Sequence, residues 1–222
     1  MSLLLQWFFN WPEVWALFIP LAVLLFRKRQ PTILRPIVIY LFIAFALNLF
    51  ADIIADYKRL FHFPQWLQSN NPIYNIHSVA RFACFSFFFL SVTRPSFSAT
   101  KKIIVLVFLL FVIINFIFFE NFFFFDHLSG NLLSVEAYLL LIYCMLYYLA
   151  VLNSDDEVFS RDPAFWVVTG LSIYVVVNFF VFLFYVPMIT QNPTLADNMW
   201  YVHNSAYIFF CLFITKALYA TT

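Results

Sequence analysis

Charged residues are scarce in this chain. Only 10% of its 222 residues are Asp, Glu, Lys or Arg, whereas 64% are hydrophobic. Soluble domains are about one quarter charged and about half apolar. A soluble monomer of the present composition would expose apolar patches much larger than such proteins tolerate. The composition therefore excludes an ordinary soluble domain and predicts a chain that folds in a lipid bilayer.

Glycine and cysteine are also rare. There are two glycines, Gly130 and Gly170, and of the ten prolines only Pro20 falls in the interior of an expected helix. The helices should therefore be continuous, unlike the broken helices that mark binding sites in many transporters. The three cysteines are dispersed in apolar runs, which argues against a disulfide framework or a zinc knuckle. No cofactor is predicted, and a net charge of +1 gives no general attraction to nucleic acid.

Long apolar runs make up most of the chain. A helix that crosses a bilayer needs about 20 mostly apolar residues. The segments that meet this requirement are residues 5–26, 34–56, 73–93, 102–120, 131–152, 164–187 and 198–219. The polar stretches between them are short, so we expect one domain over residues 1–222. The predicted fold class is all-α, a polytopic membrane protein built as a bundle of seven transmembrane helices, with segment 102–120 peripheral and facing lipid.

The distribution of Lys and Arg predicts the orientation of this bundle. Cytoplasmic loops of membrane proteins carry an excess of these residues. In this chain most of them follow the first, third and fifth segments or lie near the C-terminus, with Lys58 and Arg59 as the exceptions. We therefore expect the N-terminus outside and the C-terminus in the cytoplasm. The residues that set this expectation are Arg27, Lys28, Arg29, Arg35, Arg94, Lys101, Lys102, Arg161 and Lys216.

Polar side chains recur inside the expected spans, on single helix faces and in the outer half of the membrane. Asn48 and Asp52, for example, are four residues apart and share a face. An ionisable group at the centre of a membrane helix costs roughly 2.5–3.5 kcal/mol, so such residues mark candidate functional sites. We expect a pocket open to the outside. Its candidate ligand-binding residues are Asn48, Asp52, Tyr74, Asn75, His77, Ser78, Arg81, Glu136, Asn178, Trp200, His203, Asn204 and Tyr207.

Such a pocket favours a receptor-like sensory or accessory protein that binds a small ligand or a lipid headgroup. Arg81 would meet an anionic group, and Asp52 and Glu136 would balance its charge. A structural alternative uses the same residues without a ligand: Arg81 pairs with Glu136 or Asp52 and ties helices together. Buried ion pairs of this kind add little stability by themselves, and the chain carries more polar groups than one such pair needs.

Two other functions would use the same polar residues. A membrane-embedded enzyme acting on a lipid would employ His77 and His203 as acid–base groups or metal ligands, with Glu136 or Asp52 assisting. No paired spacing such as H-x-x-x-H supports a metal-dependent hydrolase, so no metal ligand or catalytic residue is assigned and a binding protein is favoured over an enzyme. A small transporter or proton pathway would rely on the same carboxylates.

Three stretches resemble a known group of proteins. NNPIYNIHSVARF (70–82), DPAFWVVTGLSIYVVVNFFVF (162–182) and MWYVHNSAYI (199–208) are similar to segments of small seven-helix bacterial inner-membrane proteins, and related bundles occur beside, or fused to, sensor histidine kinases. The resemblance implies a multi-pass protein of the bacterial inner membrane with a sensory role. It also implies a cytoplasmic or membrane signalling partner, and it assigns no catalytic residue.

Overall fold

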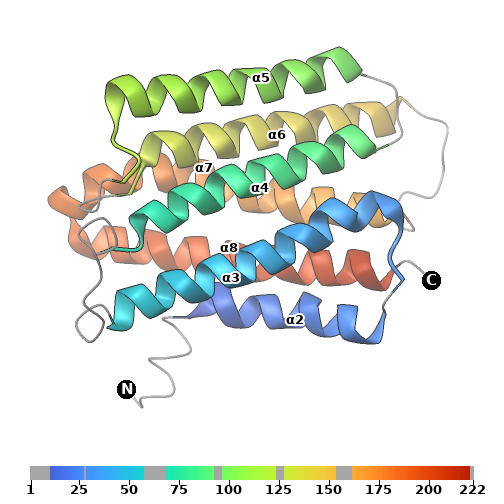
Figure 1. Cartoon of the computed structure of the whole chain (residues 1–222), viewed down its shortest axis with the longest axis horizontal. Coiled ribbons are helices and arrows are strands. Elements are labelled where there is room, and N and C mark those ends of the chain that lie inside the picture. Colours follow the sequence, from blue (N-terminus) through green and yellow to red (C-terminus); the bar gives the residue numbers. More distant parts are fainter. Residues whose placement is uncertain are drawn as a thin grey trace.

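The chain folds as a bundle of helices (Figure 1). The structure, a computed structural model, describes residues 11–27, 29–57, 69–92, 97–123, 128–153 and 162–220, and these contain no strand. The helices are α2 (Pro12–Phe26), α3 (Arg35–Tyr57), α4 (Asn71–Ser91), α5 (Ser98–Ile114), α6 (Gly130–Leu152), α7 (Pro163–Gln191) and α8 (Pro193–Tyr219). Each predicted segment coincides with one of these helices, so the all-α class is confirmed.

The first helix is shorter than the predicted segment 5–26. It begins at Pro12, with Trp11 as the residue before it, and residues 5–10 lie outside the described residues. Pro12 suits the first helical turn because its missing N–H would have no partner there. At 1.5 Å per residue, the 15 residues of α2 extend over about 22 Å. Glu13 consequently lies in the first turn of α2, at one end of the bundle.

The junction between α7 and α8 also differs from the prediction. Residues 188–197 were expected to form a loop, yet α7 continues to Gln191 and α8 begins at Pro193. Asn192 separates the two helices, and its side-chain oxygen accepts a hydrogen bond from the Leu195 amide at 3.1 Å. An Asn cap followed by Pro starts a new helix efficiently. Pro187, expected at a helix end, lies inside α7.

Six helices form a closed ring, and the seventh lies outside it. α2 packs against α3, α3 against α4, α4 against α6, α6 against α7, α7 against α8, and α8 against α2. α5 covers the outside of α4 and α6 and forms one edge of the bundle in Figure 1. Only Lys101, Ile104 and Phe108 of α5 are buried. The expectation that segment 102–120 is peripheral therefore agrees with the packing.

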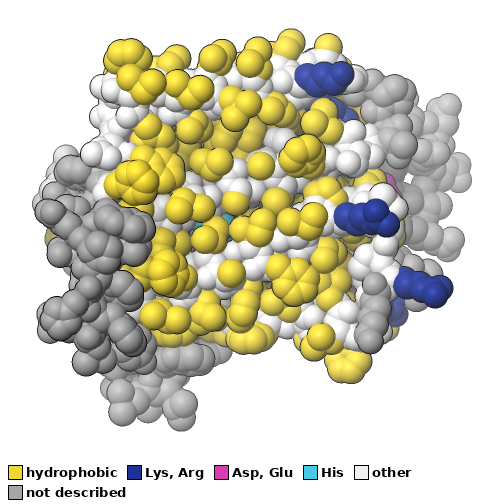
Figure 2. Space-filling view, in the orientation of Figure 1, with side chains coloured by type: hydrophobic (Ala, Val, Ile, Leu, Met, Phe, Trp, Pro, Cys, Tyr) yellow, Lys and Arg dark blue, Asp and Glu magenta, His cyan; other side chains and the backbone are white. Residues whose placement is uncertain are grey.

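Apolar surface dominates the outside of the bundle. Figure 2 shows hydrophobic side chains over most of one face between the two ends of the molecule. Among the described residues, five helical segments are long and apolar enough to cross a membrane: Thr32–Asp56, Asn71–Ser91, Ser98–Phe119, Gly130–Leu152 and Pro163–Gln191. The last stretch of the third segment, Asn115–Phe119, is a π-helical turn. These are the properties of a membrane protein, because water would not tolerate an apolar surface of this extent.

Most of the described basic residues and most of the described acidic residues lie at opposite ends of the bundle. At the end where α2, α4, α6 and α8 begin lie Glu13, Asp56, Glu120 and Asp197, and we call it the acidic end. Figure 2 shows Lys and Arg side chains at the opposite, basic end. Apart from Arg81 in the interior, every described Lys or Arg lies at the basic end: Arg27, Arg29, Arg35, Lys101, Lys102 and Lys216.

Candidate functional site

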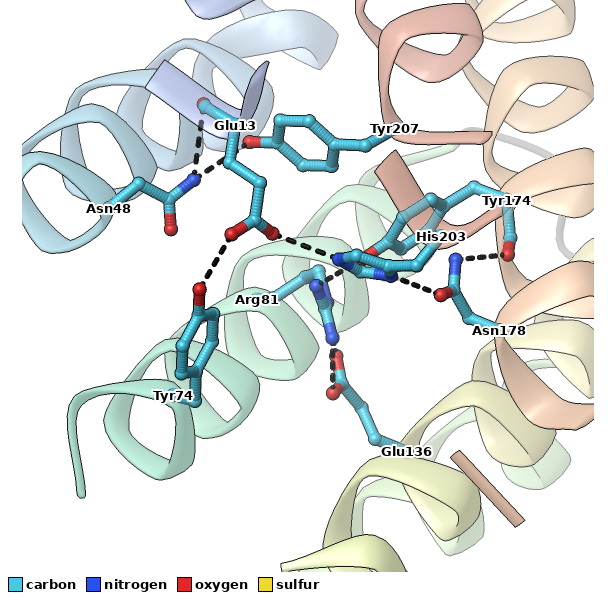
Figure 3. A network of polar contacts seen from close by, with 9 residues as sticks. All are labelled: Glu13, Asn48, Tyr74, Arg81, Glu136, Tyr174, Asn178, His203 and Tyr207. Carbon is cyan, nitrogen blue, oxygen red and sulfur yellow. Dashed lines mark hydrogen bonds and ion pairs between the residues drawn. The ribbon is translucent and has the colours of Figure 1, made fainter. Parts of the chain in front are cut away.

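Glu13 connects three other helices near the acidic end (Figure 3). Its Oε2 accepts a hydrogen bond from the Tyr74 hydroxyl on α4 at 2.8 Å, and its Oε1 lies 3.0 Å from Nε2 of His203 on α8. The backbone oxygen of Glu13 accepts from Asn48 Nδ2 on α3 at 3.3 Å. Asn48 Nδ2 also lies 3.3 Å from the hydroxyl of Tyr207 on α8. These contacts hold the first turn of α2 inside the bundle.

His203 faces oxygen atoms at both of its ring nitrogens. Nε2 faces the Glu13 carboxylate, and Nδ1 makes a short contact with Oδ1 of Asn178 on α7. The Asn178 amide nitrogen is engaged elsewhere, because it donates to the Tyr174 backbone oxygen at 2.7 Å. A doubly protonated imidazolium satisfies both acceptor oxygens. His203 thus links α8 to α2 through Glu13 and to α7 through Asn178.

Arg81 and Glu136 form a second buried group. Arg81 Nε and one terminal nitrogen donate to the two carboxylate oxygens of Glu136 at 2.6 and 2.7 Å, a bidentate arrangement between α4 and α6. The other terminal nitrogen donates to the Tyr174 hydroxyl at 2.7 Å, and Ser78 donates to Glu136 at 2.5 Å. Arg81 is 5% exposed and Glu136 is fully buried. Every guanidinium nitrogen thus donates within the protein, and the hypothesis that Arg81 meets an anionic ligand gains no support from this geometry.

The acidic end contains a cavity of about 440 Å³. Glu13 and Asp52 in its wall are buried, whereas Asp56 and Asp197 are exposed. Indole and phenol rings form much of the remaining wall. The lining residues are Trp11, Pro12, Glu13, Asp52, Ala55, Asp56, Asn70, Asn71, Tyr74, Leu128, Tyr185, Ile189, Asp197, Trp200, Tyr201 and Asn204. Helices α2, α3, α4, α7 and α8 therefore all contribute to one cavity.

Two oxygen atoms in this wall have unused hydrogen-bonding capacity. Among the described residues, neither Asp52 Oδ2 nor Asn204 Oδ1 has a hydrogen-bond partner. Asp52 is 9% exposed and Asn204 is 6% exposed. Buried polar groups in folded proteins are normally paired with protein or water, so these two acceptors indicate a place where another molecule supplies donors.

A smaller space lies beneath the main cavity and shares Glu13, Tyr74, Leu128 and Trp200 with it. Its volume of about 10 Å³ corresponds to roughly one water molecule. His77 lines this space, and its Nε2 has no partner among the described residues. The polar interior thus continues inward from the main cavity toward Arg81.

Most of the site residues predicted from the sequence lie in the wall of the main cavity or in the buried hydrogen-bond network. Asp52, Tyr74, Trp200 and Asn204 line the main cavity. Eight residues belong to the hydrogen-bond network: Asn48, Tyr74, Ser78, Arg81, Glu136, Asn178, His203 and Tyr207. Asn75 lies apart from both, because its amide nitrogen donates to the Phe122 backbone oxygen at 2.9 Å.

Sequence reasoning missed Glu13, the residue with the most connections in the outer network. The predicted first helix began at residue 5, which put Glu13 well inside an apolar segment where nothing distinguished it. The usable signal was an acidic residue directly after a proline, a pattern typical of a first helical turn. Asp56, Tyr185 and Asp197 also line the cavity but were not among the predicted site residues. Asp197 was expected in the loop between the last two helices, whereas the structure places it in α8.

The fold and the cavity together define a class: a helical membrane protein with a carboxylate- and aromatic-lined cavity at one end. Among the described residues, no group of three His, Cys, Asp or Glu side chains lies close enough to hold a metal ion. Comparison with known proteins found no matching family model, no matching curated protein and no matching solved structure.

Proposed function

We propose that the chain is a seven-span membrane protein that binds a small ligand in the cavity at its acidic end, in a receptor-like or accessory role. The observation that carries this proposal is the pair of buried, unpartnered oxygens of Asp52 and Asn204 in the cavity wall. A cavity of about 440 Å³ falls within the size range of small-molecule sites. Among the described residues neither acceptor has a donor, and a bound ligand would supply one.

The charge of the two ends supports an orientation for this protein. Lys and Arg prefer the cytoplasmic side of a membrane, and every described Lys or Arg other than Arg81 lies at the basic end. In a bacterial inner membrane the cavity would then open to the periplasmic side. The N-terminus would lie outside and the C-terminus in the cytoplasm.

The hydrogen bonds around the cavity support a signalling role. Glu13 joins α2 to α3, α4 and α8, and α3 and α8 also line the cavity through Asp52 and Asn204. A ligand that binds between these helices changes their relative positions or mobility. Because the helices extend to the basic end, a partner protein on the cytoplasmic side could detect that change.

Thermal unfolding of the purified protein in nanodiscs tests whether the cavity binds ligands. We expect at least one class in a panel of anionic, neutral and cationic small molecules to raise the melting temperature. Ala55→Phe, which places a ring in the cavity wall, should remove that response. Ala99→Phe is the matched control, because Ala99 is exposed at the start of α5 near the basic end. If no class stabilises the protein, or if both variants respond like the parent, the cavity is not a ligand site.

One observation favours a second candidate, a proton pathway. Polar contacts run from Glu13 through His203 to Asn178, whose amide nitrogen donates to the Tyr174 backbone oxygen (Figure 3). The Tyr174 hydroxyl separately accepts a hydrogen bond from Arg81. Proteoliposomes containing a pH-sensitive dye would test this function. We expect Glu13→Gln to abolish any proton flux that the parent protein supports. Flux that is equal in the parent and the variant would eliminate this candidate.

A further inference from the structure

We infer that the ligand of the acidic-end cavity is a small organic cation whose ammonium group carries N–H donors. This inference rests on the proposed function, because it names the chemical class of the ligand that the cavity binds. Its support comes from the charge of the wall, the two unpartnered acceptors and the aromatic side chains around them.

Among the described residues, the charged side chains of the cavity wall are all acidic. Its described residues include the carboxylates of Glu13, Asp52, Asp56 and Asp197 and no Lys, Arg or His. Glu13 Oε1 already has a neighbour, Nε2 of His203 at 3.0 Å, and Asp56 accepts a hydrogen bond from the Trp11 indole at 2.9 Å. Asp52 forms no ion pair with any described residue and is 9% exposed. A carboxylate in such surroundings is stabilised by a cation that enters the cavity.

The unpartnered atoms indicate what that cation must offer. Asp52 Oδ2 and Asn204 Oδ1 are both acceptors, so the ligand has to donate hydrogen bonds. A primary or secondary ammonium group supplies both donors and positive charge, and charge-assisted hydrogen bonds of this kind are stronger than neutral ones. A quaternary ammonium ion has the charge without the donors, and it should therefore bind less tightly.

Aromatic side chains suit the organic part of such a ligand. Trp200 is at the centre of an aromatic group, with its ring centroid 5.9 Å from Tyr74 and 5.4 Å from Tyr185. Aromatic faces attract organic cations through the ring quadrupole, and Trp does so most strongly. The cavity volume of about 440 Å³ greatly exceeds that of one metal ion. The wall is therefore suited to an amine with an apolar body.

An anionic ligand does not fit this wall. Its charge would meet several carboxylates, and the donors of Arg81 are already taken by Glu136 and Tyr174. An ammonium group could come from a free amine or from the headgroup of phosphatidylethanolamine. The carboxylates of Asp56 and Asp197 would repel the phosphate of such a lipid, which favours the free amine.

Binding of an isosteric series to the whole protein in phosphatidylglycerol nanodiscs tests this inference by calorimetry. The probes are 2-phenylethylamine, its N,N,N-trimethyl derivative, neutral 2-phenylethanol and anionic 3-phenylpropionate. We expect the primary amine to bind saturably, the trimethyl compound to bind more weakly, and the neutral and anionic compounds not to bind. Replacing phosphatidylglycerol with phosphatidylethanolamine separates the two sources: competition by this lipid with the primary amine identifies the headgroup.

Two nearly isosteric substitutions, each of which removes one negative charge, make the test specific. Asp52→Asn should weaken binding of the primary amine by about tenfold or more, because one charge-assisted contact is lost. Asp162→Asn is the charge-matched control: Asp162 caps α7 at the basic end, and Asn caps a helix equally well. Should Asp52→Asn fail to fold, Asp197→Asn on the exposed part of α8 provides a second test, with a smaller loss of affinity that disappears at high salt.

The outcomes separate this inference from the proposed function. Binding of the anionic or neutral isostere, with the response removed by Ala55→Phe, would show a ligand site that is not cationic and would overturn the inference alone. Equal affinity of the amine for the parent and for Asp52→Asn would also overturn it. If neither these probes nor the wider panel binds, the proposed function is lost together with the inference.

Discussion

Arg81 and Glu136 are two opposite charges in the interior of the bundle. Their bidentate contact joins α4 to α6. Arg81 also donates to the Tyr174 hydroxyl, and Ser78 donates to Glu136. Transfer of such charges from water is costly, so the pair as a whole adds little stability. Removal of one partner leaves an uncompensated buried charge, which typically costs about 3–5 kcal/mol. The pair therefore acts as a specific connection between two helices.

This reasoning predicts the behaviour of single and double variants. Arg81→Leu and Glu136→Leu should each lower the free energy of unfolding by about 3–5 kcal/mol, whereas the double variant should recover most of that loss. Unfolding of the purified protein in mixed detergent micelles measures all of these free energies. Losses that simply add in the double variant would mean that the two residues act independently. A stable Arg81→Leu protein that no longer binds the ligand would place Arg81 in the binding site.

Tyr74 offers a matched test of the Glu13 network. Tyr74→Phe removes the hydroxyl that donates to Glu13 Oε2 at 2.8 Å, and loss of a hydrogen bond to a charged group costs about 1.5–3 kcal/mol. Tyr201→Phe is the control, because Tyr201 also lines the cavity but is exposed. We expect a lower melting temperature for Tyr74→Phe only. Equal melting temperatures would show that Glu13 contributes no stability through this contact.

At the level of residues, the sequence predicted the polar groups on helix faces better than those at helix ends. Asn48 and Asp52 share a face of α3, and the structure directs one to the network and the other to the cavity wall. Glu13 was not predicted as a site residue, because its position in the first turn becomes evident only when the start of α2 is known. Asn75 was included because it lies in the polar first turns of the same helix as Tyr74, but its amide nitrogen donates to the Phe122 backbone oxygen, away from the cavity.

At the scale of the helices, α7 and α8 approach each other closely at Gly170. A Cβ atom at this position would lie 2.4 Å from Cβ of Phe213 and 3.1 Å from its Cγ. Such distances are not compatible with a side chain unless one helix moves. The absence of a side chain at Gly170 thus permits the close approach of the two helices, as small residues do in other membrane bundles.

Gly170→Leu should therefore destabilise the bundle. Overpacking of a tight contact costs about 1–3 kcal/mol, and the better helix propensity of Leu offsets about 1 kcal/mol or less of this. For Leu, whose side chain is much larger than one methyl group, we expect a net loss near the upper end of that range. Ser205→Leu on the exposed side of α8 is the control, and thermal unfolding is the measurement. If Gly170→Leu is as stable as the control, α7 and α8 accommodate the larger side chain without loss of stability.

Hydropathy located each helix in the chain but not the positions where helices end. A run of apolar residues shows where a helix crosses an apolar medium, whereas its ends depend on caps and prolines. Asn192 and Pro193 illustrate this: they allow α7 and α8 to continue through polar residues that hydropathy assigned to a loop. Pro12 sets the start of α2 in the same way.

At the scale of the whole molecule, the closed ring brings together residues far apart in the chain. Glu13 and His203, at opposite ends of the sequence, lie 3.0 Å apart because α2 packs against α8. Short connections predict that neighbours in sequence are neighbours in space, but they say nothing about which first and last helices meet. The peripheral place of α5 was predictable, since its surface is apolar on nearly every side.

The charge difference between the two ends predicts the orientation of the molecule in the membrane. A green fluorescent protein fused after residue 222 should fluoresce in bacterial cells, and alkaline phosphatase fused at the same place should be inactive, if the basic end faces the cytoplasm as we propose. Asn192→Cys at the acidic end should react with a membrane-impermeant maleimide added to intact cells whose outer membrane is permeable to it.

The labelling pattern determines the orientation because Asn192 and Asn153 lie at opposite ends of the bundle. Asn153→Cys, at the basic end after α6, should react only after the inner membrane is opened. The native residues Cys84, Cys144 and Cys211 are buried, so the parent protein should remain unlabelled and serves as the control. If only Asn153→Cys is labelled in intact cells, the protein has the opposite orientation to the one proposed. The cavity would then open to the cytoplasm, and its ligand would have to be an intracellular molecule.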